Sequence, residues 1–179
     1  IISQYIFKKF GGTTTKFTWI GGEDNSSLVL GDGRPFFVKL QHPNKRKSKL
    51  TSVDLNSVKL KNLKIIDKFP KKPITFSSSV EIKISSKNTL NTQYLRKLKN
   101  ICNAPVMVYE KSGKCFEKQI FSLNYKKISS HTFSLFMKVE GGLPIRRFIE
   151  GGDVSPNISE FLNCECKCDV FDFHGIDIQ

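Results

Sequence analysis

Apolar and polar residues alternate along several short stretches of the chain, and a period of two is typical of half-buried strands. The stretch 80–84 alternates cleanly, and in 15–20 the aromatic residues Phe17 and Trp19 share one face. Further alternation covers 133–139 and 164–170, and an apolar run fills 35–40 with proline at its first position. The pattern therefore predicts strands over 15–20, 35–40, 80–84, 133–139 and 164–170.

Other stretches have the spacing of helices. Leu90, Tyr94, Leu98 and Ile101 predict an amphipathic helix, and looser periodicity predicts short helices over 53–63 and 145–149. Ser155-Pro156 is expected to open another short helix, since proline is tolerated in the first helical turn. The segment 111–114 contains Ser-Gly and predicts a hairpin turn. Many strands with few helices indicate an α+β fold, in which a mixed, largely antiparallel sheet is flanked by helices. We expect residues 1–179 to form one domain.

The net charge of the chain gives the clearest indication of its binding partner. The chain has 29 lysines and arginines against 16 acidic residues, so its net charge is +13. Such an excess favours a polyanionic partner, most often nucleic acid. An anionic membrane surface is the competing interpretation, but no long basic amphipathic helix supports it, and no apolar stretch is long enough to span a bilayer. Lys45-Arg46-Lys47 and Lys71-Lys72 are candidate phosphate contacts.

The five cysteines are an odd number, which fits reduced thiols and a cytoplasmic location. Cys164, Cys166 and Cys168 alternate along one predicted strand, and this spacing favours buried core thiols over a zinc site. The three histidines are scattered singly, so no metal site is predicted. Gly31-Asp32-Gly33 lacks the Gly-Lys-Ser/Thr ending of a phosphate-binding loop, so no nucleotide cofactor is expected.

Two glycine-rich segments carry the candidate chemistry. The run Gly21-Gly22-Glu23-Asp24 follows a predicted strand, and a carboxylate on such a turn is well placed for a nucleophile. An ordinary acidic surface turn explains the run equally simply. In the second segment, 140–151, two glycines and a proline precede Arg146 and Arg147, which is compatible either with an arginine facing a cleft or with a surface pair on a helix.

Taken together, these segments resemble the archaeal and eukaryotic pseudouridine synthase ten family, whose members modify the T loop of tRNA. The resemblance rests on Gly21-Gly22-Glu23-Asp24, on the block 30–36 (Leu-Gly-Asp-Gly-Arg-Pro-Phe), on 43–46, and on 141–151 followed by Pro156-Asn157-Ile158. Order and spacing match from about Phe17 to Asp177. The resemblance implies the pseudouridine synthase fold and isomerisation of uridine at positions 54, 55 or both, with tRNA as partner and no cofactor.

The resemblance also implies roles for individual residues. Asp24 matches the catalytic aspartate and Arg146 the basic residue that pairs with it, while Phe76 falls where the family commonly has an active-site tyrosine. Arg34 matches the Arg-Pro-Phe block, and together with Lys45 and Arg46 it is a candidate for substrate binding. By these matches the chain is expected to be a catalytic domain without the family's N-terminal RNA-binding accessory region, in keeping with its start at Ile1.

Two residues depart from the family pattern. Gly22 stands where the motif has an arginine, which removes a cation near Asp24, and Phe76 lacks the tyrosine hydroxyl but retains a ring that can stack on uracil. The Gly22 departure favours a second hypothesis, a catalytically impaired RNA-binding module. A basic structural protein of a ribonucleoprotein is a third hypothesis, which explains the charge but not the aspartate turn.

Overall fold

The computed structural model describes residues 1–22, 24–70 and 73–179, and the chain divides into two compact units. Unit 1 comprises Ile1–Ile20 and Pro35–Ile74, and unit 2 comprises Gly21–Arg34 and Thr75–Gln179. The segment that carries Asp24, Gly21–Arg34, therefore belongs to unit 2 although it lies between the two parts of unit 1 in the sequence. Lys71 and Lys72 lie outside the described residues.

Unit 2 is built on a four-stranded antiparallel sheet in the order β11-β5-β9-β8. Its strands are β5 (Phe76–Ser86), β8 (Ile120–Lys127), β9 (Thr132–Glu140) and β11 (Cys166–Ile178). A smaller sheet, β10-β6-β7, consists of β6 (Val106–Tyr109), β7 (Cys115–Lys118) and β10 (Val154–Ser155). The expected α+β fold with largely antiparallel sheets is confirmed.

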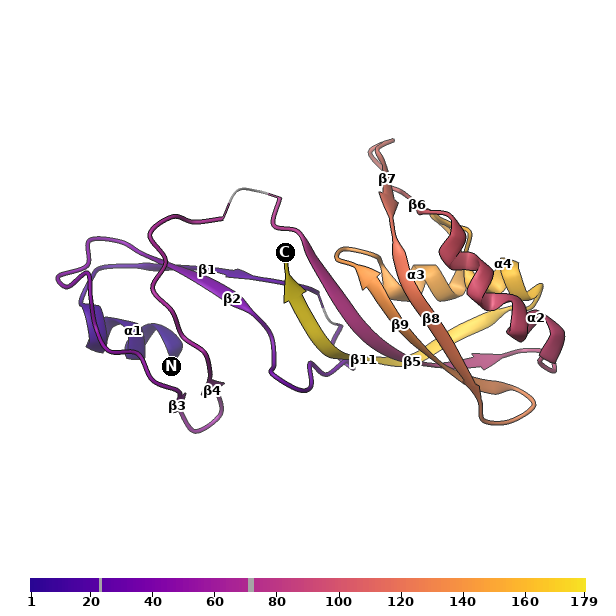
Figure 1. Ribbon diagram of the computed structural model, residues 1–179, viewed down its shortest axis with the longest axis horizontal. Coiled ribbons are helices and arrows are strands. Elements are labelled where there is room, and N and C mark those ends of the chain that lie inside the picture. Colours follow the sequence, from indigo (N-terminus) through magenta and orange to yellow (C-terminus); the bar gives the residue numbers. More distant parts are fainter. Residues whose placement is uncertain (23, 71–72) are drawn as a thin grey trace. The chain divides into compact units, whose positions relative to one another are not determined.

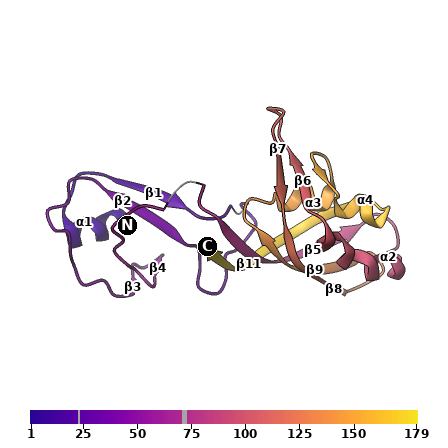
Figure 2. The same cartoon turned by 45° about the horizontal axis from the view of Figure 1, so that its top comes forward.

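Short helices lie against the four-stranded sheet (Figures 1 and 2). They are α2 (Thr92–Lys97), the 3₁₀ helix η1 (Leu98–Asn103), α3 (Ile145–Glu150) and α4 (Ile158–Leu162). Their apolar residues, such as Leu95 and Phe148, join the buried face of the strands, which includes Ile82, Ile84 and Leu135, in one hydrophobic core. This packing holds α3, and therefore Arg146, firmly against the sheet.

The alternating stretches became strands as predicted. β5 contains 80–84, and in β9 the residues Phe133, Leu135, Met137 and Val139 are all buried. The predicted turn at 111–114 joins β6 to β7. In β11, Cys166 and Cys168 are buried core thiols as predicted, whereas Cys164 precedes the strand and is half-buried.

Two helix predictions need correction at their ends. The helix expected over 90–101 is split between α2 and η1, and Leu95 rather than the exposed Tyr94 faces the core. The change from α-helical to 3₁₀ winding rotates the buried face, so the spacing read from the sequence selected the wrong residue. Pro156 does not open α4, because Asn157 caps this helix through a bond from Glu160 N–H to its side chain.

The described residues of unit 1 form the helix α1 (Ile2–Phe10) and an antiparallel ribbon of β1 (Thr15–Trp19) and β2 (Phe36–Leu40). Both strands confirm the sequence prediction. Phe17 stacks with Trp19 at a ring-centroid distance of 6.0 Å, and Trp19 lies 4.9 Å from Phe36. An aromatic row therefore lies along one face of the ribbon.

The helix predicted over 53–63 is wrong. The segment forms a small hairpin of β3 (Val53–Asp54) and β4 (Lys59–Leu60). Asn56 adopts a left-handed φ of 66°, and Leu55 N–H donates to the Val58 carbonyl across the turn. Asparagine tolerates this conformation, so Asn-Ser at 56–57 closes a turn and interrupts the loose helical periodicity.

Candidate active site

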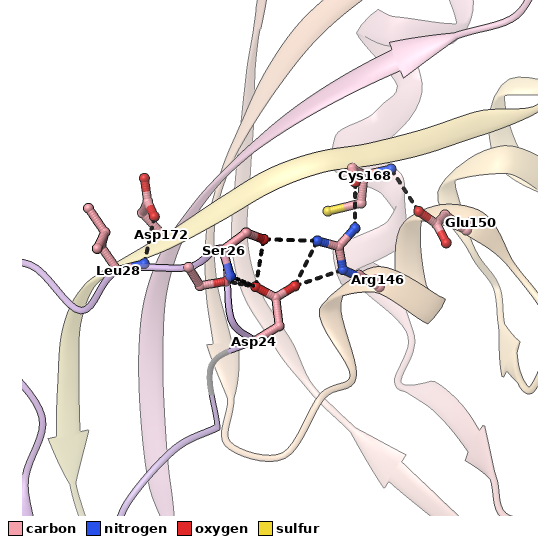
Figure 3. A network of polar contacts seen from close by, with 8 residues as sticks. Asp24, Ser26, Leu28, Arg146, Glu150, Cys168 and Asp172 are labelled. Atoms are coloured by element: carbon pink, nitrogen blue, oxygen red, sulfur yellow. Dashed lines mark hydrogen bonds and ion pairs between the residues drawn. The ribbon is translucent and has the colours of Figure 1, made fainter.

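Asp24 lies in an irregular loop that is joined to β11. Leu28 N–H donates to a carboxylate oxygen of Asp172 at 2.8 Å (Figure 3). Leu30 N–H donates to the Phe173 carbonyl, and Phe173 N–H donates to that of Leu28. This strand-like pairing fixes the loop on the edge of the sheet, although the loop itself has little regular structure.

The turn before Asp24 depends on glycine. Gly21 has a φ of +80°, and a Cβ atom there would lie 2.9 Å from Ile176 Cδ1, so a side chain would be both strained and crowded. Arg34 donates a hydrogen bond from Nη2 to the Gly21 carbonyl. The arginine of the Arg-Pro-Phe block thus holds the turn, while its predicted part in substrate binding stays a prediction.

Both oxygens of the Asp24 carboxylate are hydrogen-bonded (Figure 3). Oδ1 accepts from Ser26 N–H at 2.9 Å, from Ser26 Oγ at 2.8 Å and from Ser27 Oγ at 2.7 Å. Oδ2 receives Nε and Nη2 of Arg146, each at 2.7 Å. The carboxylate is therefore held in one orientation, with 31% of the side-chain surface still exposed to solvent.

Arg146 uses every nitrogen of its guanidinium group. In addition to the two contacts with Asp24, Nη1 donates to the Cys168 carbonyl at 2.7 Å and Nη2 to Ser26 Oγ at 3.2 Å. Cys168 N–H in turn donates to Glu150 at the end of α3, at 3.0 Å. The planar guanidinium thus ties α3, β11 and the Asp24 loop together, a geometry that a lysine would not reproduce.

These contacts set the charge state of the pair. Hydrogen bonds from Ser27, then Ser26, then Arg146 hold the pKa of Asp24 well below its usual range, although partial desolvation opposes them. The hydrogen bond to Asp24 in turn raises the pKa of Arg146. Asp24 is therefore a carboxylate, and Arg146 a cation, throughout the neutral range.

A pocket of about 380 Å³ opens beside this pair, within the usual size range of ligand sites. Its lining includes Gly22, two residues before Asp24, and Ile145, the residue before Arg146. The other lining residues are Gly21, from the turn before Asp24, and a mostly apolar set from three strands and the loop before α3: Phe76, Ser78, Val139, Glu140, Gly142, Leu143 and Phe173.

Phe76 is placed in this pocket by a close glycine contact. A Cβ atom at Gly141 would lie 2.5 Å from three atoms of the Phe76 ring, and Gly141 N–H donates to the Phe76 carbonyl at 2.7 Å. Any side chain at 141 would therefore displace the ring. In unit 2, Phe76 thus lines the same pocket as Gly22 and Ile145, the chain neighbours of Asp24 and Arg146.

Lys45 and Arg46 belong to unit 1, where both are exposed in the loop after β2. Their predicted role in binding substrate stays a prediction. Sequence reasoning missed Ser26 and Ser27, although an aspartate followed two residues later by serine is a common signal for a side-chain-stabilised turn. It also missed Ser78, for which no local signal exists, and it singled out Gly141 without its contact with Phe76.

In the described residues, no group of three or more histidine, cysteine or acidic side chains is arranged to hold a metal ion. All five cysteines are free thiols. Burial raises the pKa of Cys166 to about 12 and that of Cys168 to about 11, so both are inert core groups. Within the described part of the chain, no helix has both the length and the apolar character needed to cross a membrane.

Comparison with known families places the chain in one of them. The family described as "Pus10, C-terminal" matches residues 1–177. The chain belongs to this Pus10 C-terminal family. It is 56% identical to the tRNA pseudouridine synthase Pus10 of Nitrosopumilus maritimus over 99% of the chain and 47% of that relative.

Two further archaeal relatives carry the same name, tRNA pseudouridine synthase Pus10. The chain is 34% identical to that of Cenarchaeum symbiosum over 100% of the chain and 44% of the relative. It is 30% identical to that of Methanosphaera stadtmanae over 99% of the chain and 48% of the relative. The chain thus spans about half the length of the curated Pus10 relatives it matches.

Proposed function

We propose that this chain is the catalytic part of a tRNA pseudouridine synthase that isomerises uridine in the T loop, at position 54, 55 or both. The observation that carries the proposal is the Asp24–Arg146 pair beside the pocket, in a member of the Pus10 C-terminal family. In this proposal Asp24 is the catalytic carboxylate, Arg146 holds it charged and oriented, and Phe76 stacks on the extruded uracil.

Pseudouridine formation breaks the bond from uracil N1 to ribose C1′, rotates the base, and joins C5 to C1′. A proton leaves C5 and N1 gains one, so the reaction needs no redox partner and no nucleoside triphosphate. Asp24 is suited to act as a nucleophile or as a base at the ribose. Its depressed pKa makes it a weak base, which favours the nucleophilic role.

The hydrogen bonds around Asp24 constrain how it reacts. Because Oδ1 already accepts three donors, a lone pair becomes available only when a serine hydroxyl turns away. Serine hydroxyls rotate freely, whereas the Arg146 contacts are locked by Cys168. We therefore propose that Arg146 keeps the Asp24 carboxylate ionised and oriented. Ser26 and Ser27 cover its Oδ1 lone pairs and can turn away when Asp24 reacts.

The apolar pocket suits a flipped base. Extruding a uridine costs a few kcal/mol, and less from a loop than from a duplex. Stacking on an aromatic ring returns about 1–3 kcal/mol per base. The half-buried Phe76 ring, fixed by Gly141, is the candidate for this contact.

Charge supports RNA as the partner, and it is concentrated in one unit. Unit 1 has 14 lysines and arginines against two acidic residues, whereas unit 2 has 15 against 14. The net charge of +13 therefore comes almost entirely from unit 1, with Lys45 and Arg46 among its exposed cations. We propose that unit 1 supplies most phosphate contacts to tRNA.

The second candidate function is RNA binding without catalysis, and Gly22 is the observation that favours it. A Cβ atom at Gly22 would have no neighbour within 4 Å, so the missing arginine leaves room that nothing else among the described residues fills. Asp24, Arg146 and Phe76 remain together despite this change, which supports the catalytic proposal.

The test is pseudouridine formation in unmodified tRNA transcript, detected by carbodiimide treatment and primer extension. Wild type is compared with Asp24→Asn, and Asp32→Asn, an exposed acid on the next turn, is the matched control. We expect product with wild type and Asp32→Asn and none with Asp24→Asn. Salt-sensitive tRNA binding without product in wild type would instead support the RNA-binding module.

A further inference from the structure

The pocket contains one polar side chain that its surroundings do not explain. Apart from its glycines, it is lined by apolar side chains together with Ser78 and Glu140. Glu140 is fully engaged, because Oε1 accepts from Lys118 Nζ at 3.0 Å and Oε2 accepts from Gln119 N–H at 3.1 Å. Ser78 is only 3% exposed, and its hydroxyl makes no hydrogen bond to another group in the described part of the chain.

The sheet holds Ser78 rigidly in place. It lies on the central strand β5, paired with Val139 on β9 and with Ile176 on β11. Two residues before it on the same face is Phe76, and the face continues as Val80, Ile82 and Ile84, all buried and apolar. Ser78 is thus a break in an otherwise apolar face, at the point where that face lines the pocket.

The Ser78 hydroxyl borders the pocket and is bonded to no other group among the described residues. A ligand atom that pairs with it gains a hydrogen bond that alanine or valine at this position could not make. The pocket therefore has a place for a polar atom of its ligand, within reach of the Phe76 ring.

We infer that Ser78 contacts the base, with its hydroxyl hydrogen-bonded to the polar edge of the extruded uracil; this rests on the proposed function. Uracil presents O2, N3–H and O4 along that edge. Exchanging N1 for C5 at the ribose swaps the places of O2 and O4 and leaves N3–H where it was. Because a hydroxyl both donates and accepts, Ser78 can satisfy this edge before and after the rotation.

The test compares Ser78→Ala with Ser77→Ala in the full chain. Ser77 is the neighbouring serine on the same strand, is also 3% exposed, and does not line the pocket. The measured quantities are the single-turnover rate of pseudouridine formation at saturating enzyme and the Kd for tRNA. We expect Ser78→Ala to slow the rate about fivefold with Kd unchanged, because one hydrogen bond is worth about 1 kcal/mol.

A third variant, Ser78→Thr, retains the hydroxyl and is expected to restore most of the rate. The inference is overturned if Ser78→Ala reacts as fast as wild type, if Ser77→Ala is equally slow, or if threonine fails to rescue a folded protein. Product from wild type with no effect of Ser78→Ala would leave the proposed function standing. An inactive wild type would overturn the proposed function itself, and this inference with it.

Discussion

Unit 2 contains the hydrophobic core, whereas unit 1 contains most of the net positive charge. The apolar residues of the hydrophobic core all lie within 80–173, in unit 2, whereas the buried apolar residues that the structure describes in unit 1 are Phe10, Ile20 and Leu60. Unit 1 nevertheless carries nearly all of the net positive charge. Lysine-rich segments bury poorly and a packed core excludes charge, so the two properties separate along the chain.

This separation shows why the candidate catalytic residues lie in unit 2. Holding Asp24 and Arg146 within hydrogen-bond distance requires supports that do not shift, and these come from β11 and α3. Phosphate contacts tolerate flexible side chains, because charge attraction acts over about a Debye length. If the comparison is right, changes in unit 2 should alter catalysis or folding, and changes in unit 1 should alter affinity.

The largest effect is expected at Arg146. Arg146→Gln removes the cation and two donors to Asp24, and losing one such oriented group typically costs about 10²–10³ in rate. Single-turnover assays should show this loss with little change in the Kd for tRNA. Arg147→Gln is the matched control, since the neighbouring arginine is paired with Asp153 at 3.5 Å instead; an equal loss in this control would contradict the role of Arg146.

Core stability provides the next contrast. Phe148 is fully buried in unit 2, so Phe148→Ala should lower the free energy of unfolding by about 3–5 kcal/mol. Phe36→Ala, in the half-exposed aromatic row of unit 1, should cost only about 1 kcal/mol. Urea unfolding followed by circular dichroism measures both.

The fluorescence of Trp19, the single tryptophan, reports on unit 1 in the same samples. We expect Phe148→Ala to move the circular dichroism transition to lower urea. A fluorescence transition that moves by the same amount would mean that the two units unfold as one. The units would then differ in charge but not in stability.

Phosphate binding should depend on unit 1. Changing Lys45, Arg46 and Lys47 together to Gln is expected to weaken tRNA binding and to reduce the slope of log K against log salt by about 2–3. The control changes three exposed lysines of unit 2, Lys111, Lys114 and Lys126, and so removes the same charge. Filter binding between 50 and 200 mM salt, roughly the range over which such contacts weaken, distinguishes the two; equal effects would mean that charge acts without regard to position.

The smallest effect concerns pH. Hydrogen bonds hold the pKa of Asp24 below its ordinary value. The stabilisation that the ionised carboxylate gives the folded protein is therefore fully present above about pH 4, and it is lost only as the pH falls further. Ser27→Ala removes the largest of these hydrogen bonds and should move the acid limb of the single-turnover rate to higher pH. An acid limb identical to wild type would show that Ser27 does not tune the carboxylate.

The sequence predicted those strands whose pattern is set by residues close to one another along the chain. Strands at 15–20, 80–84 and 133–139 follow from alternation, because each face of a strand is set by residues two apart, and the strand at 35–40 follows from its apolar run. The segment 53–63 was mispredicted because a left-handed Asn56 outweighed weak periodicity. Tyr94 was predicted on the buried face in place of Leu95, because the helix changes from α-helical to 3₁₀ winding after Lys97.

At the site, the Asp24 turn, the glycine–arginine segment and their resemblance to one family were enough to nominate the candidate catalytic residues. How these residues come together follows from the fold alone. Arg146 reaches Asp24 across 122 residues of sequence, Gly141 makes room for the Phe76 ring, and β5 turns Ser78 into the pocket. Such contacts depend on which strands pair and which faces pack, and no spacing along the chain encodes that geometry.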